Sequence, residues 1–351
     1  MRIWYLLGWV LLLQCVTSCN HDELCYHHPH NAKVRVDVDW LKFVQEVPTG
    51  MTVMVYPQEG SLTEVVTQHT NTTGHALFSL PVGRYHSIVY NQSPSEFGSL
   101  SFRGMEKFET AEVFANPTDS RWYVSRGDEE GRVVTDPEWL GTDQVKDMMV
   151  TPEMVEKTGQ DNMSQLGKGT PTPRTNNSFL IGEHTPLNIV YTVTVTVHIE
   201  GIYNLRSARA SLSGLAEGYW LGQGKPTANK VTHLLEDWKM TLDPDDSTKG
   251  TIVAQITCFG LPEGHQGKPE ENELGLSVLL VDNKTILDFP FYVGGDFEEQ
   301  IEEDVRLELR LFLEVTLPTP LPDVKPEGGS SGGFDATVDD WGEEEEIDVN
   351  M

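Results

Sequence analysis

The side chains best suited to chemistry gather near the N-terminus, where His21, His27, His28 and His30 stand close together with Cys25 among them. Neutral imidazole and thiolate are good ligands for zinc, copper and nickel. Their spacing matches no closed zinc motif, and a flexible segment gives little preorganisation. A polar tether is therefore the favoured interpretation, with His27, His28 and His30 kept as candidate metal ligands and no cofactor expected.

Two further groups of residues have the chemistry to bind a ligand. Residues 243–246 crowd aspartates into one loop, which suits calcium, but the glycine and terminal glutamate of a helix-loop-helix calcium site are missing. A hairpin turn is favoured there. The aromatic pairs at residues 122–123 and 219–220 offer faces for sugar rings, although packing into a core is favoured for them.

No catalytic constellation follows from the sequence. The chain contains no Gly-x-Ser-x-Gly elbow, and isolated serines and histidines do not define a triad. Its 54 acidic residues guarantee that some carboxylates lie near one another, so paired carboxylates carry no signal for glycoside hydrolysis. We therefore expect a protein that is not an enzyme.

Cys19 is the residue with the clearest predicted chemistry. Residues 1–18 are typical of a signal peptide, with Arg2 as the only charge, an apolar run at 3–13 and small or polar residues at 16–18. The run is too short to span a bilayer. This ending resembles a bacterial lipobox, in which the chain is cut before the cysteine and Cys19 is acylated, for instance with palmitate. The alternative is an ordinary cleaved signal. Lipid of the outer membrane is then the expected partner.

The two other cysteines expected in the mature chain are Cys25 and Cys258. An exported protein can form a disulfide. Cys258, however, alternates with Ile252, Ala254 and Ile256 on an apolar strand face, where a free cysteine is a small core residue. Two free thiols are favoured, and a disulfide stays open.

The charge and the length of the chain limit the kinds of protein that it can be. A net charge of −29 opposes binding to nucleic acid and to anionic lipid head groups. A chain of 351 residues exceeds what one core usually serves, so two domains are expected.

The body of the chain is patterned as β-strands. Apolar and polar residues alternate at 34–40 and 52–56, which predicts a half-buried sheet, and strict alternation over 189–199 predicts the clearest strand. Residues 76–90, with proline and glycine in the middle, predict a hairpin. A short helix is expected to begin near residues 151–152. We therefore expect an all-β protein built from antiparallel sandwiches.

These elements divide the chain into two tandem domains. The expected order is a tether at 19–32, an N-terminal sandwich at 33–165, a linker at 166–184, a C-terminal sandwich at 185–318 and a Pro/Gly-rich, acidic tail at 319–351. Apolar residues recur among the acidic ones of the tail. Residues 334–349 are therefore expected to add a strand to a sheet of this chain or of a partner.

Three segments together resemble a known protein family. They are the cysteine-led tether at 19–30, Leu-Pro-Val-Gly-Arg-Tyr at 80–85 and Ala-Ser-Leu-Ser-Gly-Leu-Ala-Glu-Gly at 210–218. In these segments the chain resembles the fimbrial accessory and anchor lipoproteins of Bacteroidetes, also called fimbrillin-like proteins, and a related Bacteroides lipoprotein family of undetermined function. The resemblance covers most of the mature chain, and its motifs are structural.

The resemblance implies two transthyretin-like or immunoglobulin-like sandwiches displayed on the outer membrane at the cell surface. It also implies contacts with fimbrial subunits by strand addition, in pilus assembly or adhesion. Polymerising subunits of that pilus class lose an N-terminal strand by cleavage after a basic residue. Cleavage at Arg35 would cut within the first predicted strand, so an anchor or solitary surface role is favoured. The alternative is a glycan-binding surface lipoprotein of a polysaccharide-uptake system.

Overall fold

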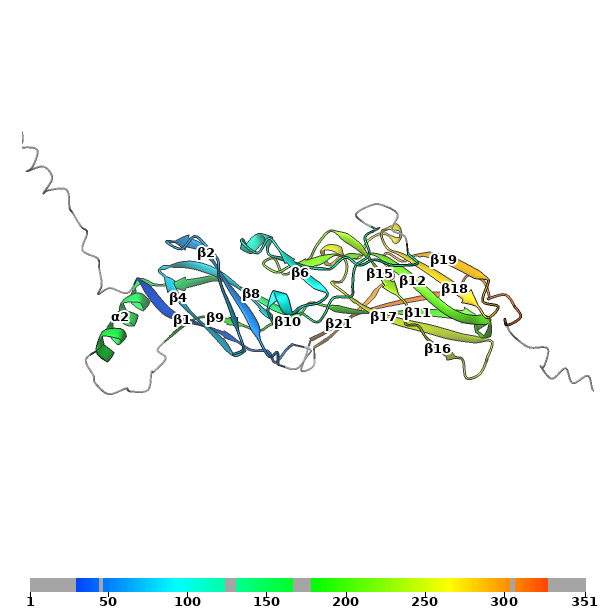
Figure 1. The fold of residues 1–351 in the computed structure, drawn as a ribbon, viewed down its shortest axis with the longest axis horizontal. Helices are drawn as coiled ribbons and strands as arrows, with labels where there is room; N and C mark the ends of the chain where they lie inside the picture. Colours follow the sequence, from blue (N-terminus) through cyan, green and yellow to red (C-terminus); the bar gives the residue numbers. More distant parts are fainter. Residues whose placement is uncertain (1–29, 44–46, 124–130, 167–177, 304–306, 328–351) are drawn as a thin grey trace, which may run out of the picture.

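The structure is a computed structural model that describes residues 30–43, 47–123, 131–166, 178–303 and 307–327. Most regular elements in these ranges are β-strands, which confirms the predicted all-β class. The α-helix among them, α2 (Pro152–Leu166), begins where the short helix was predicted. The described residues include no helix that is long and apolar enough to cross a membrane. The molecule is elongated, with two β-sandwiches placed end to end (Figure 1).

The N-terminal sandwich packs a three-stranded sheet against a five-stranded sheet. The smaller sheet has the order β4 (His75–Pro81), β1 (Asn31–Val38) and β9 (Phe179–His184). The larger sheet has the order β10 (Leu187–Asn188), β8 (Gly141–Val150), β5 (Gly83–Asn91), β2 (Met51–Gly60) and β3 (Val66–Thr70). Alternate side chains, such as Val34 of β1 and Val53 of β2, fill the space between the sheets.

Helix α2 covers the start of strand β1. The backbone N–H of Lys33 donates to Oγ1 of Thr158 at 3.2 Å, and Met154 and Val155 pack against the core of the N-terminal sandwich. Strand β1 pairs with β9 only from Val34 onward. The helix therefore supplies a hydrogen-bond partner on the side of β1 where pairing with β9 has not yet begun.

The C-terminal sandwich packs a five-stranded sheet against a four-stranded sheet. The larger has the order β16 (Lys239–Leu242), β17 (Lys249–Cys258), β11 (Tyr191–Glu200), β21 (Leu307–Thr316) and β20 (Glu298–Glu303). The smaller has the order β15 (Lys230–Leu235), β12 (Leu205–Ala216), β18 (Glu273–Leu280) and β19 (Ile286–Tyr292). In β11, Val193, Val195 and Val197 are buried and the threonines between them are partly exposed, as the alternation predicted.

A fifth sheet in the described residues joins the two sandwiches. Its order is β14 (Lys225–Pro226), β13 (Gly218–Trp220), β7 (Glu112–Ala115) and β6 (Leu100–Arg103), so each half of the chain contributes two strands. This junction sheet packs on the outer face of β2 and β5, where Met54, Tyr56, Ile88 and Tyr90 are buried. Because β2 is covered on both faces, the prediction of a half-buried strand at 52–56 is wrong.

The predicted hairpin at residues 76–90 is also wrong. Strand β4 pairs with β1, whereas β5 pairs with β2 and β8, so the chain passes from one sheet to the other at residues 81–83. The hydroxyl of Tyr85 donates to the carbonyl of Pro81 at 2.8 Å and closes this corner. Proline and glycine suit a corner as well as a tight turn, so the local sequence does not distinguish the two.

Two further differences concern the ends of the strands and their direction. Residues 179–184, predicted as linker, form β9, and β1 begins within the last residues of the predicted tether. The pairs β1–β9 and β11–β21 are parallel, so the sandwiches are not purely antiparallel. Parallel pairs join segments that are far apart in the chain, and local patterns carry no sign of them.

Candidate functional site

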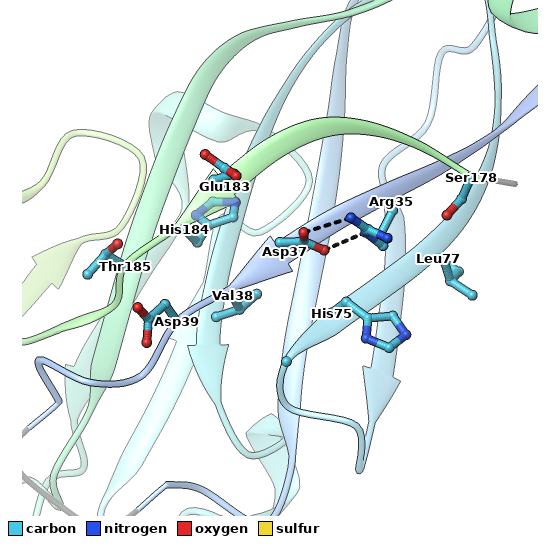
Figure 2. Close-up of a pocket in the computed structure, with 11 residues that line it drawn as sticks. Arg35, Asp37, Val38, Asp39, His75, Leu77, Ser178, Glu183, His184 and Thr185 are labelled. Carbon is cyan, nitrogen blue, oxygen red and sulfur yellow. Dashed lines mark hydrogen bonds and ion pairs between the residues drawn. The ribbon is translucent and has the colours of Figure 1, made fainter. Parts of the chain in front are cut away.

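A depression of about 690 Å³ lies on the outer face of the smaller N-terminal sheet, where β1, β4 and β9 meet (Figure 2). Arg35 and Asp37 of β1 form an ion pair there, with Nε and Oδ1 at 2.6 Å. His75 of β4 and Glu183 of β9 stand in register on either side of Asp37. Arg35 and Asp37 point outward because the valines between them point into the core.

This depression suits contact with a partner better than catalysis. Arg35 and Asp37 offset each other's charge and are both about one third exposed, so water screens the pair. Within the described residues, no group of three or more His, Cys, Asp or Glu side chains is arranged to hold a metal ion. The depression has polar walls that can accept polar side chains of a partner.

Beneath the depression, a serine, a histidine and an aspartate are connected in the same order as in the catalytic triad of serine hydrolases. Nε2 of His184 lies 2.7 Å from Oγ of Ser87, and Nδ1 of His184 lies 3.2 Å from Oδ2 of Asp143. The backbone N–H of Thr185 donates to the same carboxylate at 2.9 Å. Burial raises the pKa of Asp143, but the hydrogen bonds from His184 and Thr185 outweigh it, so the pKa lies below its ordinary value. The sequence gives no sign of this group because its members are distant in the chain.

The burial of Ser87 argues against nucleophilic catalysis. Ser87 and His184 are 0% and 1% exposed, and the Ser87 hydroxyl also contacts Sδ of Met148 at 3.4 Å. A nucleophile must reach its substrate, and this one faces the interior of the sandwich. Since β9 supplies the histidine while β5 and β8 supply its partners, the group joins the two sheets through polar contacts.

A buried ion cluster lies at the junction of the two sandwiches. Arg103 of β6 donates to both carboxylate oxygens of Glu112 at 2.7 and 2.6 Å and to Glu217 at 3.1 Å. Arg132 pairs with Glu217 as well, and Asn229 donates to it at 3.0 Å. Both glutamates are almost fully buried, so each requires these partners. Because the cluster unites residues of both halves, it connects the two sandwiches.

Most of the predicted N-terminal site residues lie outside the described residues. Cys19, Cys25, His27 and His28 are among them, and His30 is exposed at the start of the described chain. Lipidation at Cys19 and metal binding by the histidines therefore stay predictions. Cys258 is a free, fully buried thiol, and burial raises its pKa to about 12.

The aspartate-rich loop and the aromatic pairs, the other candidate ligand sites, lie mainly within the described residues. Residues 243–246 lie in the turn between the paired strands β16 and β17, and Asp243 accepts the N–H of Asp245 at 2.8 Å, so the predicted hairpin turn is confirmed. Trp122 is only partly buried and lies 4.8 Å from the guanidinium of Arg209, so the favoured core packing is wrong for it. Tyr219 packs against the junction core as expected. The tail segment 334–349 lies outside the described residues.

Comparison with known proteins gives one family and several relatives. The family described as a domain of unknown function, DUF5119, matches residues 18–236. A proposed fimbrium anchoring subunit, Fim4B of Bacteroides ovatus, is 21% identical over 221 residues, which are 62% of this chain and 56% of that protein. The match thus spans little more than half of that relative's length.

A solved structure shows the same fold. This proposed adhesin from Bacteroides ovatus has a TM-score of 0.51 at 15% identity, over 87% of this chain and 99% of that one. The fimbrial anchor protein Mfa2 of Porphyromonas gingivalis has a TM-score of 0.42 at 13% identity, over 80% and 95%, which is too low to carry an argument. The match to Fim4B confirms the predicted resemblance to fimbrial anchor proteins of Bacteroidetes. Because the family match covers well over half of the chain, this protein belongs to the DUF5119 family.

Proposed function

We propose that this protein is a non-enzymatic lipoprotein of the outer membrane, exposed at the cell surface through acylated Cys19, that serves as a fimbrial anchor or accessory subunit in pilus assembly or adhesion. The observation that carries the proposal is the course of the chain. The described residues begin with His30 at one end of the rod and finish with Glu327 at the opposite end (Figure 1). A lipid on Cys19 would hold the N-terminal sandwich near the membrane and direct the C-terminal sandwich away from it.

The edge strand β16 supports contact with fimbrial subunits by strand addition. Within the described residues β16 pairs only with β17, so its other edge carries unpaired backbone groups. All four of its residues are exposed, and Met240 and Leu242 are each 51% exposed. An exposed edge with apolar side chains is a template for another strand. This edge lies in the C-terminal sandwich, the part that would extend from the membrane.

Glycan binding at the cell surface is a second candidate function. A groove with polar and aromatic walls at the junction of the two sandwiches favours it over a purely mechanical role.

Replacing Cys19 tests the anchor proposal. In cells that carry Cys19→Ser, we expect the chain to leave the membrane fraction and to lose incorporation of a labelled fatty acid, because the acylated thiol would be gone. Fimbriae held by this protein would then be found in the medium rather than on cells, as counted by electron microscopy.

Cys25→Ser is the matched control, since it removes a neighbouring thiol and should retain both lipid and fimbriae. Membrane retention of the Cys19→Ser chain would contradict the anchor. Loss of the lipid without release of any fimbriae would contradict the fimbrial role.

A further inference from the structure

A groove of about 570 Å³ lies where the larger C-terminal sheet meets the N-terminal half of the molecule. Its floor is the outer face of β11, β17 and β21. Thr194 of β11 stands between Gln255 of β17 and Phe312 of β21, and Thr192 stands beside Arg310. These side chains face outward because Val193 and its alternate neighbours fill the core.

Trp139 of the N-terminal half also lines the groove. It precedes β8 and is partly buried, and it packs against both the junction core and the core of the N-terminal sandwich. A ring held by two cores has little freedom to lose when a ligand binds. Together with Phe312, it gives the groove aromatic surface beside its polar floor.

The polar groups of the groove are also held in place. Nε2 of Gln255 donates to Oγ1 of Thr194 at 3.0 Å, which fixes the amide plane. Arg310 lies between two carboxylates, with Nη1 at 3.2 Å from Oε1 of Glu302 and a second hydrogen bond to Glu308. Because these side chains are already ordered, they lose little conformational entropy when a ligand binds.

The charge balance of the groove disfavours anionic ligands. Arg310 is paired with both Glu302 and Glu308, so the three side chains together carry an excess of one negative charge. The chain as a whole carries a net charge of −29, which further disfavours anions. The uncharged hydroxyl and amide groups of the floor and the aromatic rings suit a ligand with hydroxyl groups and an apolar C–H face, and a neutral saccharide has both.

We propose that this groove binds a short neutral saccharide. The volume falls within the range of about 300–1,000 Å³ that small-molecule sites occupy. The wider depression in Figure 2 is a poorer candidate because its walls carry the charged side chains Arg35, Asp37 and Glu183 and no Trp, Tyr or Phe ring. The proposal rests on the second candidate function, glycan binding, and deepens it by naming the site and the class of ligand. It is independent of the anchor function, which needs only lipid and protein contacts.

The test is saturation-transfer NMR on the purified full chain with defined trisaccharides. Maltotriose, cellotriose, mannotriose and tri-N-acetylchitotriose serve as neutral probes, and trigalacturonic acid serves as the anionic comparison. We expect at least one neutral probe to bind, and more tightly than trigalacturonic acid. Failure of every neutral probe, or preference for the anionic one, overturns the proposal.

Two variants place the binding in this groove. Thr192→Val and Gln255→Leu each remove hydrogen-bonding groups from the floor at similar volume, so each should weaken the bound probe by about fivefold. Thr196→Val is the matched control, since Thr196 lies on the same face of β11 outside the groove. Trp139 is left intact because its replacement would disturb two cores.

Near-UV circular dichroism checks that each variant retains its packing. Equal affinity in the groove variants, or the same loss in Thr196→Val, would show that the saccharide binds elsewhere and would overturn the assignment. Binding is measured on isolated protein and does not involve Cys19. If no saccharide binds, the anchor proposal is therefore unaffected. If the Cys19→Ser experiment contradicts the anchor, the saccharide measurement can still be interpreted.

Discussion

At the scale of single residues, the polar group of Ser87, His184 and Asp143 is the least expected feature of the N-terminal sandwich. It has the connectivity of a catalytic triad but lies between the two sheets, with Ser87 fully buried. Buried polar groups are retained when every member has a partner. Its role is therefore to hold β9 of the smaller sheet in place over β5 and β8 of the larger one.

The depressed pKa of Asp143 makes this role testable by pH. A carboxyl whose folded pKa lies below its ordinary value of 3.8 stabilises the fold fully above that value, and the stabilisation is lost as the pH falls through the folded pKa. We expect Asp143→Asn to lower the melting temperature at neutral pH. The gap between wild type and variant should shrink as the pH falls below 3.8.

Asp147→Asn is the matched control for this prediction. Asp147 lies on the same strand, is exposed and pairs only loosely with Arg84 at 3.7 Å. Its replacement should leave the melting temperature almost unchanged at both ends of the pH range. A gap for Asp143→Asn that stays constant with pH would contradict the assigned role of the carboxylate.

At the scale of elements, the corner between β4 and β5 decides how the N-terminal sandwich is built. The chain changes sheets at residues 81–83 instead of folding back on itself. Gly83 makes this possible, since a Cβ atom there would lie 2.4 Å from the carbonyl oxygen of Glu59. The corner therefore requires close approach of two backbones rather than a tight turn.

Gly83→Ala should accordingly reduce the free energy of unfolding by about 1–3 kcal/mol, because the added methyl group must push the β2 and β5 backbones apart. Urea denaturation followed by far-UV circular dichroism measures this change. Gly74→Ala is the control, since a Cβ atom at Gly74 would meet nothing within 4 Å. Equal stability of the two variants would show that the corner tolerates a side chain.

At the scale of the whole molecule, the junction connects the two sandwiches into a single unit. The junction sheet takes strands from both halves, and the buried carboxylates of Glu112 and Glu217 are paired there with the partly exposed Arg103. A backbone hydrogen bond from Leu307 to Lys42 adds a direct connection between the sandwiches. The two sandwiches are therefore expected to unfold together rather than as independent domains.

Arg103→Gln should weaken this junction. Glu112 would lose its charged partner in a buried site, which we expect to cost about 2–3 kcal/mol, less than for a fully buried pair because Arg103 is partly exposed. By calorimetry the wild type should unfold in one transition, and the variant in two as the sandwiches uncouple.

Arg35→Gln provides the comparison, because it removes a surface ion pair of the N-terminal sandwich away from the junction. It should retain a single transition with little loss of stability. Two transitions in the wild type, or one in Arg103→Gln, would contradict the coupling of the halves.

The sequence by itself determined the class of the fold and the strands with the clearest alternation. The alternation in β11, the helix start near Thr151 and the turn at residues 243–246 are local features, set by side-chain period and turn chemistry. The apolar run and small residues before Cys19 are local as well, so they support a lipidation prediction without any structure.

Only the tertiary structure decided which strands are neighbours. The parallel pairs β1–β9 and β11–β21, the sheet change after β4 and the junction sheet join segments far apart in the chain. The same contacts bury both faces of β2, bring His184 to Ser87 and bring Trp139 and Thr192 to one groove. Such contacts depend on the global packing of apolar faces, and local sequence patterns do not encode their partners.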